Sequence, residues 1–99
     1  MDIKDIVKFH REKFLKADKE LQERKIWEEM AEFQTAISER EKVEEAVDCI
    51  IACIGFIDKM GYDTEKEIEK KIEIIKKRPY DENDFKHINK FDTLEIVSD

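Results

Sequence analysis

Four acidic residues in the middle of the chain have the types and spacing suited to binding a divalent metal ion. Glu29 and Glu32 form one pair, and Glu45 and Asp48 form a second. In a helix, residues three positions apart project from one face about one turn apart, so each pair brings two carboxylates together. Carboxylate oxygens are the ligands that Mg²⁺ and Mn²⁺ prefer. The spacing therefore predicts a metal site if the fold brings the two pairs together.

Asp48 lies within a run of apolar and small residues, 46–57. The run has no proline and is too long for a typical strand, so it predicts a helix. Its apolar side chains point all round the helix axis, which is typical of a helix surrounded by protein. We therefore expect Asp48 to be buried, where an ionised carboxylate is costly unless positive charge lies beside it.

The elements that must position these acids are predicted to be four helices. Ser38 with Glu41, and Thr64 with Glu67, have the spacing of capping boxes and predict the starts of the third and fourth helices. Pro79 predicts the end of the fourth. The predicted helices cover about 3–16, 18–37, 38–60 and 64–78.

A very short connection joins the second and third helices, which predicts an antiparallel hairpin. Facing residues in such a hairpin have position numbers that add up to the same total. Glu32 with Glu45 gives the same total as Glu29 with Asp48, so the acids are expected at two matching levels. A divalent cation would offset their mutual repulsion. Because glutamate is abundant in this chain, a solvated acidic face remains the alternative, whereas a di-iron centre lacks its Glu-x-x-His motifs.

Composition agrees with one small all-α domain. The 99 residues include only two glycines and one proline, and 40% are hydrophobic against 45% charged. The net charge of −7 argues against a nucleic-acid polymer or an anionic membrane as a partner. The central apolar run is shorter than the roughly 20 residues that span a bilayer. Because residues 1–5 include the charged residues Asp2, Lys4 and Asp5 and no apolar signal segment follows, we expect a cytoplasmic protein.

Two parts of the chain leave open how the domain is completed. The helix that contains the all-round apolar run needs more neighbours than three short helices provide, which predicts a homo-oligomer. Residues 81–99 are polar with scattered apolar positions, and we expect them to pack on the 1–80 domain or on a partner subunit.

Lys71 and Arg78 lie seven positions apart on one helical face. They either neutralise phosphate oxygens or complement a helix C-terminal dipole.

The acidic motifs resemble those of a known family. Glu29-Met30-Ala31-Glu32, followed after twelve residues by Glu45-Ala46-Val47-Asp48, resembles the ExxE…ExxD signature of the MazG-like all-α nucleoside triphosphate pyrophosphohydrolases. Phe9-His10 is similar to an "FH" pair of phage-type members. The segment from Lys71 to Tyr80 is similar to their "KxxxNxxRxY" segment, except that Ile75 stands at the asparagine position. The resemblance covers roughly residues 6–80.

The resemblance implies an antiparallel four-helix MazG-like bundle, completed by formation of a homodimer or homotetramer. It implies an Mg²⁺-dependent hydrolase, with Mn²⁺ as a possible substitute, that cleaves a nucleoside triphosphate between the α and β phosphates. The implied metal ligands are Glu29, Glu32, Glu45 and Asp48. The implied substrate-binding residues are Lys71, Arg78, Tyr80, His10 and Trp27, with Phe9 and Phe14 as further candidates for contact with the base.

If the protein is such a pyrophosphohydrolase, three carboxylates are candidates for the catalytic base: Glu28, Glu44 and Glu45. Two other functions remain open. One is a non-catalytic helical interaction protein whose acids bind a structural ion or only solvent. The other is an enzyme similar to phosphoribosyl-ATP pyrophosphatase.

Overall fold

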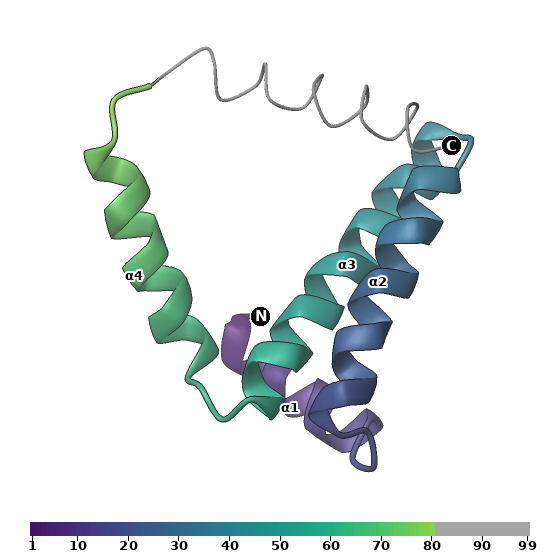
Figure 1. Ribbon diagram of the computed structural model, residues 1–99, viewed down its shortest axis with the longest axis horizontal. Helices are drawn as coiled ribbons and strands as arrows, with labels where there is room; N and C mark the ends of the chain where they lie inside the picture. Colours follow the sequence, from purple (N-terminus) through teal and green to yellow (C-terminus); the bar gives the residue numbers. More distant parts are fainter. Residues whose placement is uncertain (81–99) are drawn as a thin grey trace.

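The structure, a computed structural model, describes residues 1–80. This part of the chain contains four helices and no strand, which confirms the predicted all-α class (Figure 1). The predicted packing of residues 81–99 lies outside the described residues. The helices are α1 (Ile3–Lys13), α2 (Lys19–Thr35), α3 (Glu39–Lys59) and α4 (Thr64–Lys77).

Helices α2 and α3 form the predicted antiparallel hairpin and make the most extensive helix–helix contact of the structure (Figure 1). Asp18 caps α2 by accepting a hydrogen bond from the backbone N–H of Leu21 at 2.9 Å. Ser38 caps α3 in the same way through the N–H of Glu41 at 3.1 Å, as predicted. These caps satisfy backbone donors that have no partner within the helix. The short turn between α2 and α3 determines which residues of the two helices face each other.

Helix α1 packs against the C-terminal half of α3. The ring of His10 lies directly against Gly55 of α3, where any larger residue would overlap it. Arg11 donates two hydrogen bonds to Asp58 of α3, at 2.8 and 2.7 Å. This bidentate arrangement is the strongest form of an Arg–carboxylate pair. Together the two contacts hold α1 in position beside the hairpin.

A turn after α3 sends α4 away from the hairpin. Gly61 has φ +87°, the left-handed conformation typical of a residue that follows a helix. The N-cap of α4 is Asp63, which accepts a hydrogen bond from the N–H of Lys66, so the predicted cap at Thr64 is wrong by one residue. Helix α4 contacts α1 and α3 near this turn and makes no contact with α2 (Figure 1).

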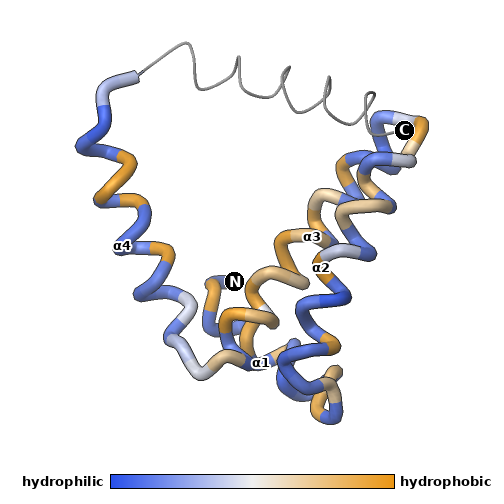
Figure 2. Tube along the Cα trace, in the orientation of Figure 1, coloured by the Kyte–Doolittle hydropathy of each residue, from blue (hydrophilic) through white to orange (hydrophobic). Residues whose placement is uncertain are grey.

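The core formed by residues 1–80 is small, because many large apolar residues of this part of the chain stay exposed. Ala52 and Ile54 are its buried hydrophobic residues. Within residues 1–80, the prediction that α3 is surrounded by protein is therefore wrong, since α1 and α2 cover only part of its circumference. Figure 2 shows hydrophobic positions along α3 and α4. The exposed apolar residues of the hairpin and α4 include Met30, Phe33, Ile37, Val43, Val47, Ile50, Ile72 and Ile75. No helix within residues 1–80 is long and apolar enough to cross a membrane.

Candidate metal centre

The hairpin brings the two acidic pairs together. Glu29, Glu45 and Asp48 each offer a carboxylate oxygen, and these oxygens lie within 4.8 Å of one another. A second group of the same size, Glu28, Glu29 and Glu32, shares Glu29 with the first. The predicted register of the hairpin is therefore confirmed. Three carboxylate oxygens this close are of the ligand type that a hard divalent cation prefers.

Glu29 is the buried acid at the centre of this cluster. Its side chain is only 7% exposed, and Lys25 one turn earlier pairs with its Oε1 at 2.9 Å. Its other oxygen, Oε2, is buried and has no hydrogen-bond partner within residues 1–80, and the same is true of Oε2 of Glu45. Buried carboxylate oxygens normally have partners. Two such atoms in one cluster suit the donor set of a cation site.

Asp48 is exposed in the single chain, so the prediction that it is buried is wrong. The apolar run of α3 packs through Ala52, Ile54 and Gly55, whereas Val47 beside Asp48 is 47% exposed. The physical reason is that, within residues 1–80, α2 packs against only one side of α3 at this level. Asp48 still reaches Glu29 and Glu45, so its predicted place in the acid cluster holds.

Glu32 holds its proton more tightly than an ordinary glutamate because other carboxylates lie close to it. The pKa of Glu32 rises from 4.5 to about 7, chiefly because it forms a hydrogen bond with Glu45 and because the charge of Glu29 is close. Carboxylates that approach one another cannot all ionise freely, so one of them keeps its proton. Within residues 1–80 no Lys or Arg forms an ion pair with Glu32, Glu45 or Asp48. A divalent cation would supply the missing positive charge.

A cavity of about 660 Å³ opens beside the acids, between α1, α2 and α3. This volume is within the usual range for sites that hold a small organic ligand. One end is acidic and the other is aromatic and apolar. The residues that define its two ends are Glu28, Glu29 and Asp48, and His10, Phe14 and Leu21.

His10 is almost completely buried, at 2% exposure, in the wall of this cavity. Burial lowers its pKa and so favours the neutral ring, although contact with the side chain of Gln22 partly offsets the effect. The ring of Phe14 lies next to it, with ring centroids 4.8 Å apart. Nδ1 of His10 and Oε1 of Gln22 are buried without hydrogen-bond partners within residues 1–80. The wall therefore combines aromatic surface with unused polar groups.

Several predicted substrate-binding residues do not reach the acids within one chain. Lys71 and Arg78 are exposed on α4 and just after it, and α4 makes no contact with α2. Trp27 is 73% exposed and Tyr80 is 78% exposed, and neither lines the cavity. Phe9, at 50% exposure, is also outside it. Of the predicted contacts, the structure brings His10 and Phe14 to the cavity.

The two candidate bases outside the metal ligands are separated by their neighbours. Glu28 lines the cavity and belongs to one of the acid groups. Glu44 forms an ion pair with Arg40 at 2.9 Å and belongs to neither group. Glu28 is therefore better placed than Glu44 to act on a molecule in the cavity.

Sequence reasoning missed Lys25 and Gln22. Lys25 had a detectable signal, because it lies four positions before Glu29, where a lysine pairs with a glutamate on one helical face. Gln22 had none, since a glutamine in a polar helix is normally solvated. Both line the cavity next to the acids.

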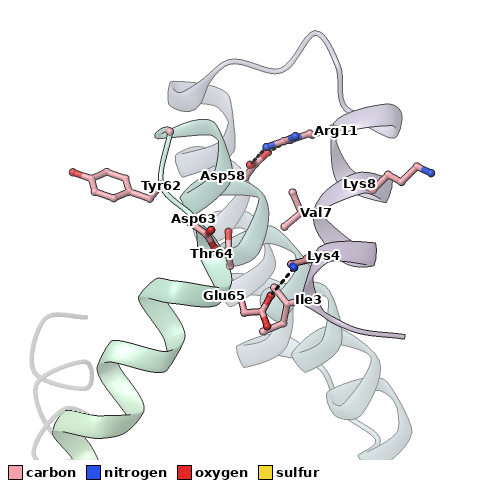
Figure 3. A pocket seen from close by; sticks show the side chains of 11 residues that line it. Ile3, Lys4, Val7, Lys8, Arg11, Asp58, Tyr62, Asp63, Thr64 and Glu65 are labelled. Carbon is pink, nitrogen blue, oxygen red and sulfur yellow. Dashed lines mark hydrogen bonds and ion pairs between the residues drawn. The ribbon is translucent and has the colours of Figure 1, made fainter.

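A second cavity, of about 470 Å³, lies between α1 and the start of α4 (Figure 3). Its charged residues largely neutralise each other: Arg11 pairs with Asp58, and Lys4 approaches Glu65 at 4.0 Å. None of the predicted metal ligands lines it. This cavity therefore belongs to the contact between helices and not to the acid cluster.

Comparison with known proteins found no matching family model, no matching curated protein and no matching solved structure. The functional interpretation therefore depends on the residues and their geometry.

Proposed function

We propose that this protein is a metal-dependent nucleoside triphosphate pyrophosphohydrolase of the MazG-like type. The observation that carries the proposal is that Glu29, Glu45 and Asp48 meet at the acidic end of a ligand-sized cavity, where Glu29 and Glu45 each have a buried oxygen without a partner. The order and spacing of these acids also resemble the ExxE…ExxD signature. If a metal-bound triphosphate occupied the acidic end, the aromatic end of the cavity would be left for the nucleobase.

Glu29, Glu32, Glu45 and Asp48 would hold Mg²⁺, or Mn²⁺ in its place. The carboxylate oxygens and the absence of histidine or cysteine from both acid groups favour a hard cation. When bound, such an ion offsets the charge of the phosphate oxygens and lowers the pKa of a water molecule. Cleavage between the α and β phosphates would yield a nucleoside monophosphate and pyrophosphate.

Residues of this chain would perform the remaining steps. Glu28, at the edge of the acid cluster, would accept the proton of the attacking water, since general bases act within hydrogen-bond reach of the proton that they remove. His10 and Phe14 would contact the nucleobase of the substrate through their rings. Because the pKa of His10 is lowered, the ring would bind as the neutral form.

A second copy of the chain would complete the site. Lys71 and Arg78 are too remote from the acids of their own chain to be its phosphate ligands, and exposed apolar residues follow one face of α3 and one face of α4. Burying these faces in a homodimer or homotetramer would also bring α4 of one protomer toward the hairpin of another. Arg and Lys suit contact with phosphate oxygens.

The test is to incubate the protein with a panel of dNTPs and NTPs and Mg²⁺ in ¹⁸O-labelled water. Monophosphate that carries the label, together with unlabelled pyrophosphate, is expected for attack at the α phosphorus. Glu45→Gln and Asp48→Asn should abolish turnover with the helical circular dichroism unchanged. Glu23→Gln, an exposed glutamate of α2 outside both acid groups, is the matched control.

Other outcomes would select the alternatives. No turnover of any nucleotide with either metal would reject the proposal and favour a non-catalytic helical interaction protein. Turnover of phosphoribosyl-ATP alone would identify the specialised enzyme instead.

A further inference from the structure

Lys25 is the cation that the structure places on the buried acid of the cluster. Its Nζ lies 2.9 Å from Oε1 of Glu29 and 3.3 Å from Oε1 of Glu28. No other Lys or Arg of residues 1–80 forms an ion pair with either acid. The ammonium group therefore supplies part of the charge that a metal ion would supply.

The two partners differ in their freedom to move. The side chain of Lys25 is 44% exposed, whereas that of Glu29 is 7% exposed. A lysine has a flexible four-carbon stem and a strongly hydrated ammonium group, so it can turn into solvent at little cost. Glu29 is confined between the helices and cannot follow. Any exchange of cations at Glu29 must therefore occur by departure of Lys25.

We propose that Lys25 is an internal counter-ion, which pairs with Oε1 of Glu29 until a divalent metal ion displaces it. The proposal rests on the metal site of the proposed function. A single ammonium group reaches Glu28 and Glu29 but leaves Glu45 and Asp48 unpaired, whereas a divalent ion can contact Glu29, Glu45 and Asp48 together. The exchange is thus favourable once the ion is present.

The displaced ammonium group remains at the same cavity, because Lys25 is one of its lining residues. Freed from Glu29, it can face an anionic group of a molecule bound there. Lys25 therefore acts as a positioning residue with two partners: carboxylates without metal, and a phosphate group with metal and ligand.

The experiment is a calorimetric titration of the full chain with Mn²⁺ alone, without any nucleotide. Lys25→Met removes the competing cation and should tighten Mn²⁺ binding by about three- to tenfold. Lys42→Met is the matched control. It removes the same charge one turn from Glu45 but breaks no ion pair with the site acids, so it should change the affinity by less than about twofold.

A second variant, Lys25→Arg, keeps the positive charge and should retain the affinity of the wild type. Circular dichroism establishes that each variant remains helical. Binding of Mn²⁺ by the wild type with no tightening in Lys25→Met would overturn the inference and leave the metal site standing. Absence of Mn²⁺ binding in all of these proteins would instead reject the metal site and the proposed function with it.

Discussion

Gly55 on α3 leaves the space that the imidazole ring of His10 on α1 fills. A Cβ atom at position 55 would overlap the ring, so glycine is required there for packing and not for its backbone freedom. Gly55 therefore also affects the cavity beside the acid cluster, because His10 forms part of the wall of that cavity. One missing side chain in α3 therefore determines where α1 places an aromatic group.

Gly55→Ala should destabilise the protein by about 1–3 kcal/mol, since overpacking forces a ring or a helix to shift. The measurement is urea denaturation followed by circular dichroism. In a His10→Ala background the clash is absent, and the same change should be neutral or stabilising by up to about 1 kcal/mol through helix propensity. An equal loss of stability in both backgrounds would show that His10 and Gly55 are not coupled.

The Arg11–Asp58 pair predicts a loss of stability at acidic pH. Its hydrogen bonds from Arg11 hold the pKa of Asp58 below its ordinary value of 3.8. A carboxylate with a lowered pKa contributes stability that is present above its unfolded pKa and is lost as pH falls through the folded one. Arg11→Met should therefore be less stable than the wild type at neutral pH, and the difference should shrink below about pH 4. A difference that is independent of pH would contradict the assignment.

The raised pKa of Glu32 predicts that stability falls as pH rises, which is the opposite of the effect of Asp58. The Glu32 pKa of about 7 in the metal-free fold lies above the ordinary value of 4.5. Between these values the unfolded chain loses a proton that the folded chain keeps, so stability falls as pH rises toward about 7 and then levels off. Unfolding in EDTA across this range should show the decline in the wild type and a flatter curve in Glu32→Gln. Saturating Mg²⁺ should remove the difference in slope, because bound metal favours the ionised carboxylates.

The exposed apolar faces predict self-association. Ile50 of α3 is 56% exposed and Ile75 of α4 is 53% exposed in the single chain. Light scattering at micromolar concentration should give a dimer or tetramer, and Ile50→Asp should reduce the molar mass. Leu15→Asp, at an exposed apolar residue in the α1–α2 connection, is the control and should leave the mass unchanged. A wild-type monomer would contradict the prediction.

The parts of the site that could be predicted were those determined by local geometry. The hairpin register followed from the short turn, which is why Glu29 and Asp48 were matched correctly. Burial was harder to predict, because the sequence of a helix that is apolar on all sides does not show which side its own chain covers. The predicted burial of Asp48 was wrong for this reason. Asp63 and Thr64 are both good N-cap residues, so the start of α4 was ambiguous by one position. The direction in which α4 leaves the hairpin depends on the turn at Gly61, and the hydrophobic periodicity of the sequence does not predict the direction of a turn.

The short turn between α2 and α3 has a consequence for how sequences of this kind can change in length. Because an α-helix advances about 100° per residue, one residue inserted between Glu32 and the turn would rotate the acids of α2 away from those of α3. Seven residues make about two helical turns, so an insertion of about seven residues restores the phase closely, provided that both arms lengthen equally. Insertions and deletions that preserve the acid cluster should therefore come as matched heptads in the two arms.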